Sequence, residues 1–205
     1  MSRLPEVVGR HPFVSLGSIT YVLALLAAGF VWGRAQTPFY AVFMIVLLGV
    51  VAAVYEHRPL SRLALAGLAL WGLGHMVGGL VEVDGRIVYE WMVIPGTLRF
   101  DKIVHAFGFG FATITCFELL RPVYEGSDRG VAVYAALGGL GLGAVNEMME
   151  FLIARYSAGS NVGGFVNTGW DLVFNALGAV TAAIFCTARQ RSADESGAGR
   201  QGAAA

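Results

Sequence analysis

The chain has 205 residues, of which 56% are hydrophobic and only 14% are charged, against roughly 25% charged residues in an ordinary soluble domain. Its 14 basic and 14 acidic residues cancel, so the composition offers no basic surface for nucleic acid. These values argue against a soluble enzyme, a disordered chain and a nucleic-acid-binding protein. We expect an all-α integral membrane protein whose general partners are membrane lipids.

Six segments are long and apolar enough to cross a membrane, which takes about 20 helical residues. They cover residues 15–33, 38–55, 63–81, 101–120, 131–154 and 170–188. Helices are expected because a lipid-exposed backbone must satisfy its own hydrogen bonds. A cleaved signal peptide is the alternative for the first segment, because Arg3 and Arg10 precede it and small residues follow Arg34. The segment is longer than the usual apolar region of a signal peptide, and no clean A-x-A site precedes Gln36. We therefore predict one polytopic domain over residues 1–189, a six-span helical bundle.

The connecting segments predict the orientation of the bundle. The side that holds both termini carries nine Lys and Arg residues at or beyond the span ends, and the other side carries five. The positive-inside rule then places both termini in the cytoplasm and the protein in the inner membrane. Residues 190–205 are small and polar and predict a disordered tail, residues 83–100 an interfacial or re-entrant segment, and residues 155–169 a flexible loop.

Polar residues inside the spans carry the functional signal, because a charge at the centre of the bilayer costs about 2.5–3.5 kcal/mol on insertion scales. They are His75, Asp101, Lys102, His105, Glu118, Asn146, Glu147, Glu150, Asp171 and Asn175. Glu118 lies near the cytoplasmic end, where snorkelling or pairing with Arg121 explains it. At 1.5 Å per residue the others fall at one level on the extracytoplasmic side of four spans. We expect them to form one site.

The spacing of these residues supports a shared site. Asp101 and His105 are four residues apart, as are Asp171 and Asn175, so each pair lies on one face of its helix. Both aspartates also stand at predicted helix starts, where a carboxylate can serve as an N-cap instead.

An internal repeat relates the spans. Residues 101–108 (DKIVHAFG) match residues 171–178 (DLVFNALG) at an offset of 70, and a second match at an offset of 72 sets His75 against Glu147. The third and fourth spans therefore resemble the fifth and sixth, and the two hairpins run in the same sense. We predict a parallel pseudo-two-fold axis along the membrane normal that brings the polar residues face to face.

Three stretches resemble known membrane proteins: residues 99–105 (RFDKIVH), 146–150 (NEMME) and 171–178 (DLVFNALG). They are similar to motifs of the YjdF-like inner-membrane proteins and, more distantly, of the VanZ-like family. Glu150 stands where VanZ-like proteins commonly carry Gln, which favours the YjdF-like side. The resemblance implies a polytopic membrane protein, with some relatives linked to glycopeptide resistance, and it specifies no reaction.

Three hypotheses follow for the function. The first is a metal-dependent hydrolase or transferase acting on a lipid or envelope precursor, with a divalent ion such as zinc. The expected metal ligands are His75, Asp101 and His105, and the expected catalytic residues are Glu147, Glu150, Asp171 and Asn175. The second is an ion-coupled transporter or flippase, because acid and histidine clusters form ion relays. The third is a structural or accessory protein whose polar cluster only holds the bundle together.

Overall fold

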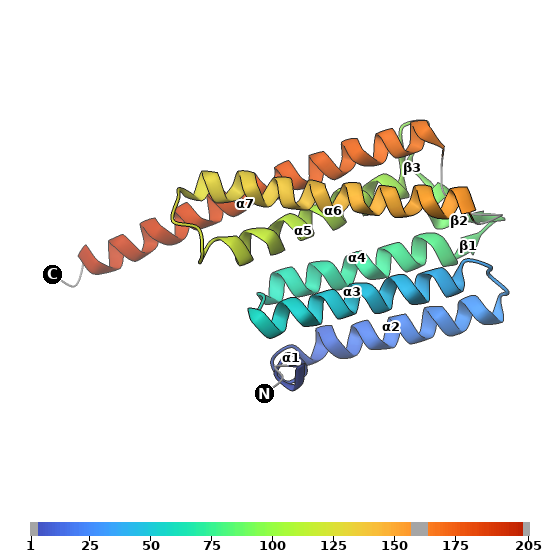
Figure 1. The fold of residues 1–205 in the computed structure, drawn as a ribbon, viewed down its shortest axis with the longest axis horizontal. Coiled ribbons are helices and arrows are strands. Elements are labelled where there is room, and N and C mark those ends of the chain that lie inside the picture. The colour runs from blue at the N-terminus through green and yellow to red at the C-terminus, as the bar shows by residue number, and fades with distance from the viewer. Residues whose placement is uncertain (1–3, 157–163, 203–205) are drawn as a thin grey trace.

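The computed structural model describes residues 4–156 and 164–202 and contains an elongated bundle of nearly parallel long helices, with a short first helix turned across them (Figure 1). The helices are α1 (Leu4–Arg10), α2 (Pro12–Val31), α3 (Thr37–His57), α4 (Arg62–Leu80), α5 (Phe100–Leu120), α6 (Asp128–Tyr156) and α7 (Phe165–Gly202). Within these ranges, six helices, α2 to α7, are long and apolar enough to span a membrane. The all-α membrane bundle predicted from the sequence is therefore confirmed.

Local sequence accounts for where several helices begin. Proline occupies the first turn of α2 and of α3, where its missing N–H is not needed. Ser61 caps α4, because its hydroxyl accepts a hydrogen bond from the Ala64 N–H at 3.1 Å. These helix starts lie within three residues of the predicted ones.

The last helix is longer at both ends than the predicted span of residues 170–188. It begins at Phe165, which replaces part of the predicted flexible loop by helix, and it continues to Gly202. The tail predicted to be disordered is thus helical up to that residue. A helix that is already nucleated adds residues at low cost, and Gln190 donates to Asp194 one turn later at 3.1 Å. The rest of the predicted loop, residues 157–163, lies outside the described residues.

Two groups of helices make up the bundle. Helices α5, α6 and α7 pack against one another, and α4 packs on α5 and joins them to α2 and α3. Glycine allows the closest approach: a Cβ atom on Gly178 of α7 would lie 1.9 Å from the Ala106 carbonyl oxygen of α5. The helix pair that carries the repeated motif is therefore in backbone contact.

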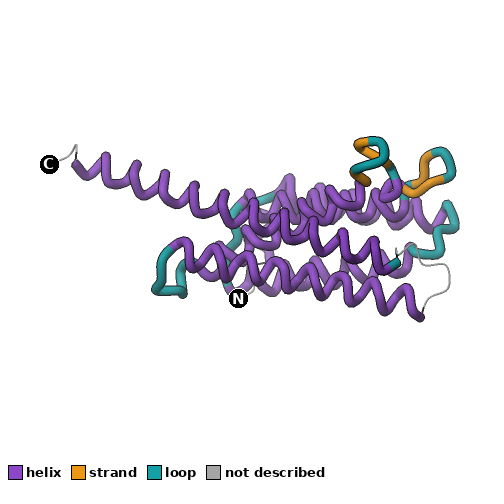
Figure 2. The backbone as a smooth tube through the Cα atoms, turned by 90° about the horizontal axis from the view of Figure 1, so that it is seen from above, coloured by secondary structure: helices purple, strands orange, loops and turns teal. Residues whose placement is uncertain are grey.

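Two short hairpins connect α4 to α5 (Figure 2). The first pairs β1 (Glu82–Val83) with β2 (Arg86–Ile87), and the second pairs β3 (Met92–Ile94) with β4 (Leu98–Arg99). Between them a 3-10 turn, η1 (Val88–Glu90), directs Tyr89 against Gly78 of α4, where a Cβ atom would lie 2.3 Å from the tyrosine ring. The segment predicted to be interfacial or re-entrant thus sends one side chain into the bundle.

Candidate functional site

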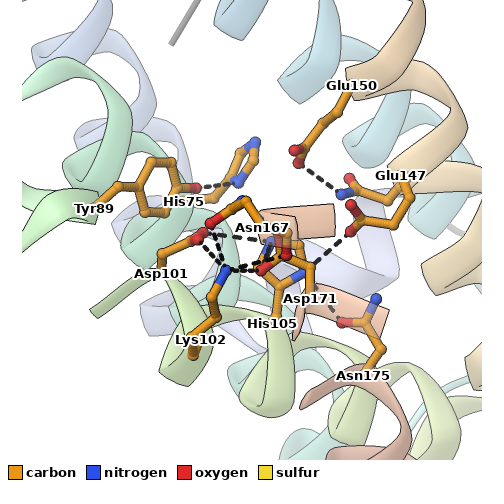
Figure 3. Close-up of polar contacts among 11 residues, drawn as sticks. His75, Tyr89, Asp101, Lys102, His105, Glu147, Glu150, Asn167, Asp171 and Asn175 are labelled. Carbon is orange, nitrogen blue, oxygen red and sulfur yellow. Dashed lines mark hydrogen bonds and ion pairs between the residues drawn. The ribbon is translucent and has the colours of Figure 1, made fainter. Parts of the chain in front are cut away.

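One polar cluster lies at the end of the bundle where α5 and α7 begin and α6 ends (Figure 3). Helix α5 contributes Asp101, Lys102 and His105, and α7 contributes Asn167, Asp171 and Asn175. Helix α6 contributes Glu147 and Glu150, together with Asn146, which is hydrogen-bonded to Glu150. The structure therefore brings the predicted site residues together, with His75 beside the others but hydrogen-bonded to Tyr89 instead of to them (Figure 3). These residues meet because they lie at the same depth along their helices, as calculated from the rise per residue, and neighbouring helices place residues of equal depth side by side.

Lys102 connects the polar side chains at the start of α5 to those at the start of α7. Its Nζ atom donates to Asp171 Oδ1 at 2.5 Å, to Asn167 Oδ1 at 2.8 Å and to Asp101 Oδ2 at 2.9 Å. An ammonium group has three donors, so all of them are used. Asn167 also donates to Asp171 Oδ2 at 2.6 Å. The sequence places Lys102 in the polar site, where the structural hypothesis pairs it with carboxylates, but sequence reasoning missed Asn167, although Asn167 stands one helical turn before Asp171.

His105 lies between the two aspartates on one side of its ring and Glu147 and Asn175 on the other. Its Nε2 atom lies 3.4 Å from Asp101 Oδ1 and 3.6 Å from Asp171 Oδ1. Its Nδ1 atom lies 3.4 Å from Glu147 Oε1 and 3.1 Å from Asn175 Oδ1. Because the side chain is only 7% exposed, both ring nitrogens interact with protein oxygens rather than with bulk solvent.

Glu147 is the least satisfied member of the cluster. The residue is 4% exposed, and neither carboxylate oxygen has a hydrogen-bond partner among the described residues. Its neighbour Glu150 accepts a hydrogen bond from Asn146 Nδ2 at 2.8 Å. Asn175 Nδ2 is likewise buried without a partner in this part of the chain. Because buried polar atoms are nearly always paired in native proteins, Glu147 indicates a ligand or proton that completes the site.

The charges of the cluster do not balance. The cluster contains four carboxylates, on Asp101, Glu147, Glu150 and Asp171, and one lysine ammonium, which pairs with the two aspartates. Among these residues three negative charges remain if His105 is neutral, and two remain if it is protonated. Burying uncompensated charge is costly, so the site needs a cation or additional protons.

Two groups of side chains have donor atoms close enough to share a metal ion: Asp101, His105 and Asp171 in one, and His105, Glu147 and Glu150 in the other, each set within 4.8 Å. The Lys102 ammonium already lies between both aspartates of the first group, so it serves as the cation there. Two ligands bound at about 2.1 Å to a tetrahedral ion stand about 3.4 Å apart. The distance between His105 Nδ1 and Glu147 Oε1 is 3.4 Å, so these two atoms of the second group are spaced like ligands of such an ion.

His75 lies apart from both metal-binding groups of the described residues. Its Nδ1 atom is hydrogen-bonded to the Tyr89 hydroxyl, and its ring contacts those of Tyr40 and Phe43, with centroids 5.2 and 4.4 Å away. Its Nε2 atom has no partner among the described residues. Burial raises the pKa of Tyr89 well above its usual value, so this phenol stays neutral and can donate a hydrogen bond. No sequence signal pointed to Tyr89.

Glu118 takes part in a separate interaction at the opposite end of the bundle. Its carboxylate accepts hydrogen bonds from the Ser61 N–H at 2.9 Å and from the Ser61 hydroxyl at 2.5 Å. Arg121, its expected partner, pairs instead with Asp128 at 2.5 Å. Glu118 therefore fixes the start of α4.

Comparison with known proteins identifies the family. Residues 13–192 match the family described as predicted membrane protein (DUF2238). The chain belongs to this family. The matched range includes every residue of the cluster. The match supports a membrane family, and it does not distinguish YjdF-like from VanZ-like proteins. No curated protein and no solved structure matches the chain significantly.

One contact between α5 and α7 joins equivalent positions of the repeated motif. His105 is hydrogen-bonded to Asn175, 70 residues later, whereas Lys102 pairs with Asp171, 69 residues later and one position away from its equivalent in the repeat. Gly110 and Gly178 face each other at the same crossing. The pseudo-two-fold axis that the repeat suggests stays a prediction.

Proposed function

We propose that this protein is a multi-pass inner-membrane enzyme, a metal-dependent hydrolase or transferase that acts on a lipid or envelope precursor at the extracytoplasmic face. The observation that carries the proposal is the buried Glu147 carboxylate, which has no hydrogen-bond partner among the described residues and lies at ligand–ligand distance from His105 Nδ1. The excess of negative charge around it favours a divalent cation.

The cation site consists of His105 Nδ1, Glu147 and Glu150, with the Asn175 Oδ1 atom as a further oxygen donor 3.1 Å from His105 Nδ1. One nitrogen with carboxylate and amide oxygens suits zinc or manganese. The opposite ring nitrogen of His105 lies near Asp101 and Asp171, in the arrangement by which outer carboxylates orient a metal-binding histidine. This proposal moves both glutamates and Asn175 from the catalytic to the ligand set and leaves Asp101 and Asp171 to position His105.

The substrate class follows from where the cluster lies. It is close to one end of the bundle, which supports a position near the lipid headgroups, and a divalent ion held by His105, Glu147 and Glu150 would activate water for attack on an ester or phosphoester. The distribution of Lys and Arg supports an extracytoplasmic position for this end. The resemblance to YjdF-like and VanZ-like proteins supports an envelope substrate.

Proton-coupled transport is the second candidate, because protons shared among the four carboxylates would also offset the charge. The metal content of detergent-purified protein, measured by mass spectrometry, separates the two. We expect near-stoichiometric zinc or manganese in the unmodified protein, at least a ten-fold loss in Glu147→Gln and no loss in Glu125→Gln, which changes an exposed glutamate outside the spans. A metal-free wild-type protein that carries protons across liposome membranes would overturn the enzyme proposal.

A further inference from the structure

A cavity of about 260 Å³ lies among α1, α2, α3 and α4, and it shares no residue with the polar cluster. It runs along α3 from Met44 to Tyr55, a length of about 16 Å at the helical rise per residue. Its lining is apolar except for His11, Ser15, Ser18, Tyr21 and Tyr55. The shape is that of a narrow, elongated and mostly apolar channel.

Unpartnered polar atoms occur at one end of this cavity. Tyr55 is 1% exposed, and its hydroxyl has no hydrogen-bond partner among the described residues. His11 Nδ1 is also buried and has no hydrogen-bond partner among the described residues. The His11 and Tyr55 rings meet edge to face, with centroids 6.4 Å apart. Towards the other end, the Tyr21 hydroxyl donates to the Ala69 carbonyl at 2.9 Å and is already satisfied. A ligand would therefore place its polar group near Tyr55 and its apolar part along α3.

The depth of these atoms matches a membrane lipid. His11 directly precedes α2, and Tyr55 is two residues from the end of α3, so both lie at the edge of the membrane-spanning region, where ester groups lie. Ile19 and Leu48 line the cavity and are 50% and 40% exposed. Since the outer surfaces of α2 and α3 are apolar, the cavity opens towards lipid rather than water.

We propose that this cavity binds one acyl chain of a membrane glycerolipid, with the ester carbonyl accepting a hydrogen bond from Tyr55. The chain buries apolar surface along α3 and α4, and the carbonyl satisfies the Tyr55 hydroxyl, which is otherwise buried without a partner. An apolar site with a few placed polar groups is the usual form of a small-molecule site.

Native mass spectrometry of the full chain in detergent tests this site, with dioleoyl phosphatidylethanolamine as the probe and oleic acid in a parallel titration. We expect one bound phospholipid in the wild-type protein, about five-fold weaker binding in Tyr55→Phe, as for the loss of one hydrogen bond, and unchanged binding in Tyr134→Phe, which changes an exposed tyrosine on α6. Ala52→Leu narrows the cavity and should abolish binding, whereas Ala53→Leu, its exposed neighbour, should not.

Two results would overturn the proposal. Equal binding by Tyr55→Phe, Ala52→Leu and the wild type would mean that the phospholipid does not bind in this cavity. Displacement of the phospholipid by equimolar oleic acid would identify a free fatty acid as the ligand. Because Tyr55→Phe is a conservative change, its effect is measurable even if Ala52→Leu does not fold.

Discussion

Lys102 determines how the acidic residues of the cluster are held. It is the single lysine of the chain, it is 6% exposed, and it joins the start of α5 to two side chains of α7. A lysine ammonium is compact and can direct three donors to separate oxygens, whereas the planar guanidinium of arginine cannot do so in the same space. Lys102 thus neutralises the two aspartates that position His105.

Replacing this lysine should destabilise the protein strongly. We expect Lys102→Met to lower the free energy of unfolding by about 3–5 kcal/mol, because it removes the ammonium that pairs with the buried Asp171 and the half-buried Asp101. The double variant Lys102→Met, Asp171→Asn should recover part of that loss. Unfolding in detergent micelles measures both, with Arg129→Met, which changes an exposed residue, as the control. Wild-type stability in Lys102→Met would show that the pairing contributes nothing.

The contact between α5 and α7 sets the geometry of the site. Gly178 lies seven residues after Asp171 and three after Asn175 on α7, and its Cα meets the backbone of α5 at Ala106. A separation of even a few tenths of an ångström would be transmitted along the rigid helix to both polar residues. Close helix packing is therefore a condition for the distances around His105.

Gly178→Ala tests this dependence. An added methyl group would lie 1.9 Å from the Ala106 carbonyl oxygen, so the helices must move apart, and overpacking of this kind costs about 1–3 kcal/mol. We expect a lower melting temperature together with weaker metal retention. Gly141→Ala is the matched control, because nothing lies within 4 Å of its added methyl group. Equal behaviour of the two variants would contradict a geometric role for the α5–α7 contact.

The molecule as a whole has polar features of different kinds at its two ends. The hairpins and the acidic cluster lie at one end, whereas the Ser61–Glu118 hydrogen bonds and the Tyr55 cavity lie at the other. This asymmetry means that the orientation in the membrane decides which compartment reaches the cluster.

Labelling of single cysteines measures this orientation. In a background with Cys116 and Cys186 replaced, we expect Thr97→Cys, in the turn between β3 and β4, to react with an impermeant maleimide added to right-side-out membrane vesicles. Ser127→Cys, just before α6, should react only after the membrane is opened. The reverse pattern would place the cluster on the cytoplasmic side and exclude an extracytoplasmic substrate.

The sequence alone determined the membrane class, the six spans and the depth of the polar residues. These properties follow from local hydropathy and from the fixed rise of a helix, so Asp101, His105, Glu147 and Asp171 could be grouped before any contact was known. The length of α7 could not be predicted from composition, because a small polar tail extends a helix that is already formed.

Only the tertiary structure decided which atoms meet. The rotation of each helix about its axis and the path of the α4–α5 connection depend on packing between distant segments. They put Lys102 between two aspartates, leave Glu147 without a hydrogen bond among the described residues, and turn His75 towards Tyr89 instead of the acidic residues. Depth is a property of one helix, but coordination is a property of several, and for that reason the ligand set required the structure.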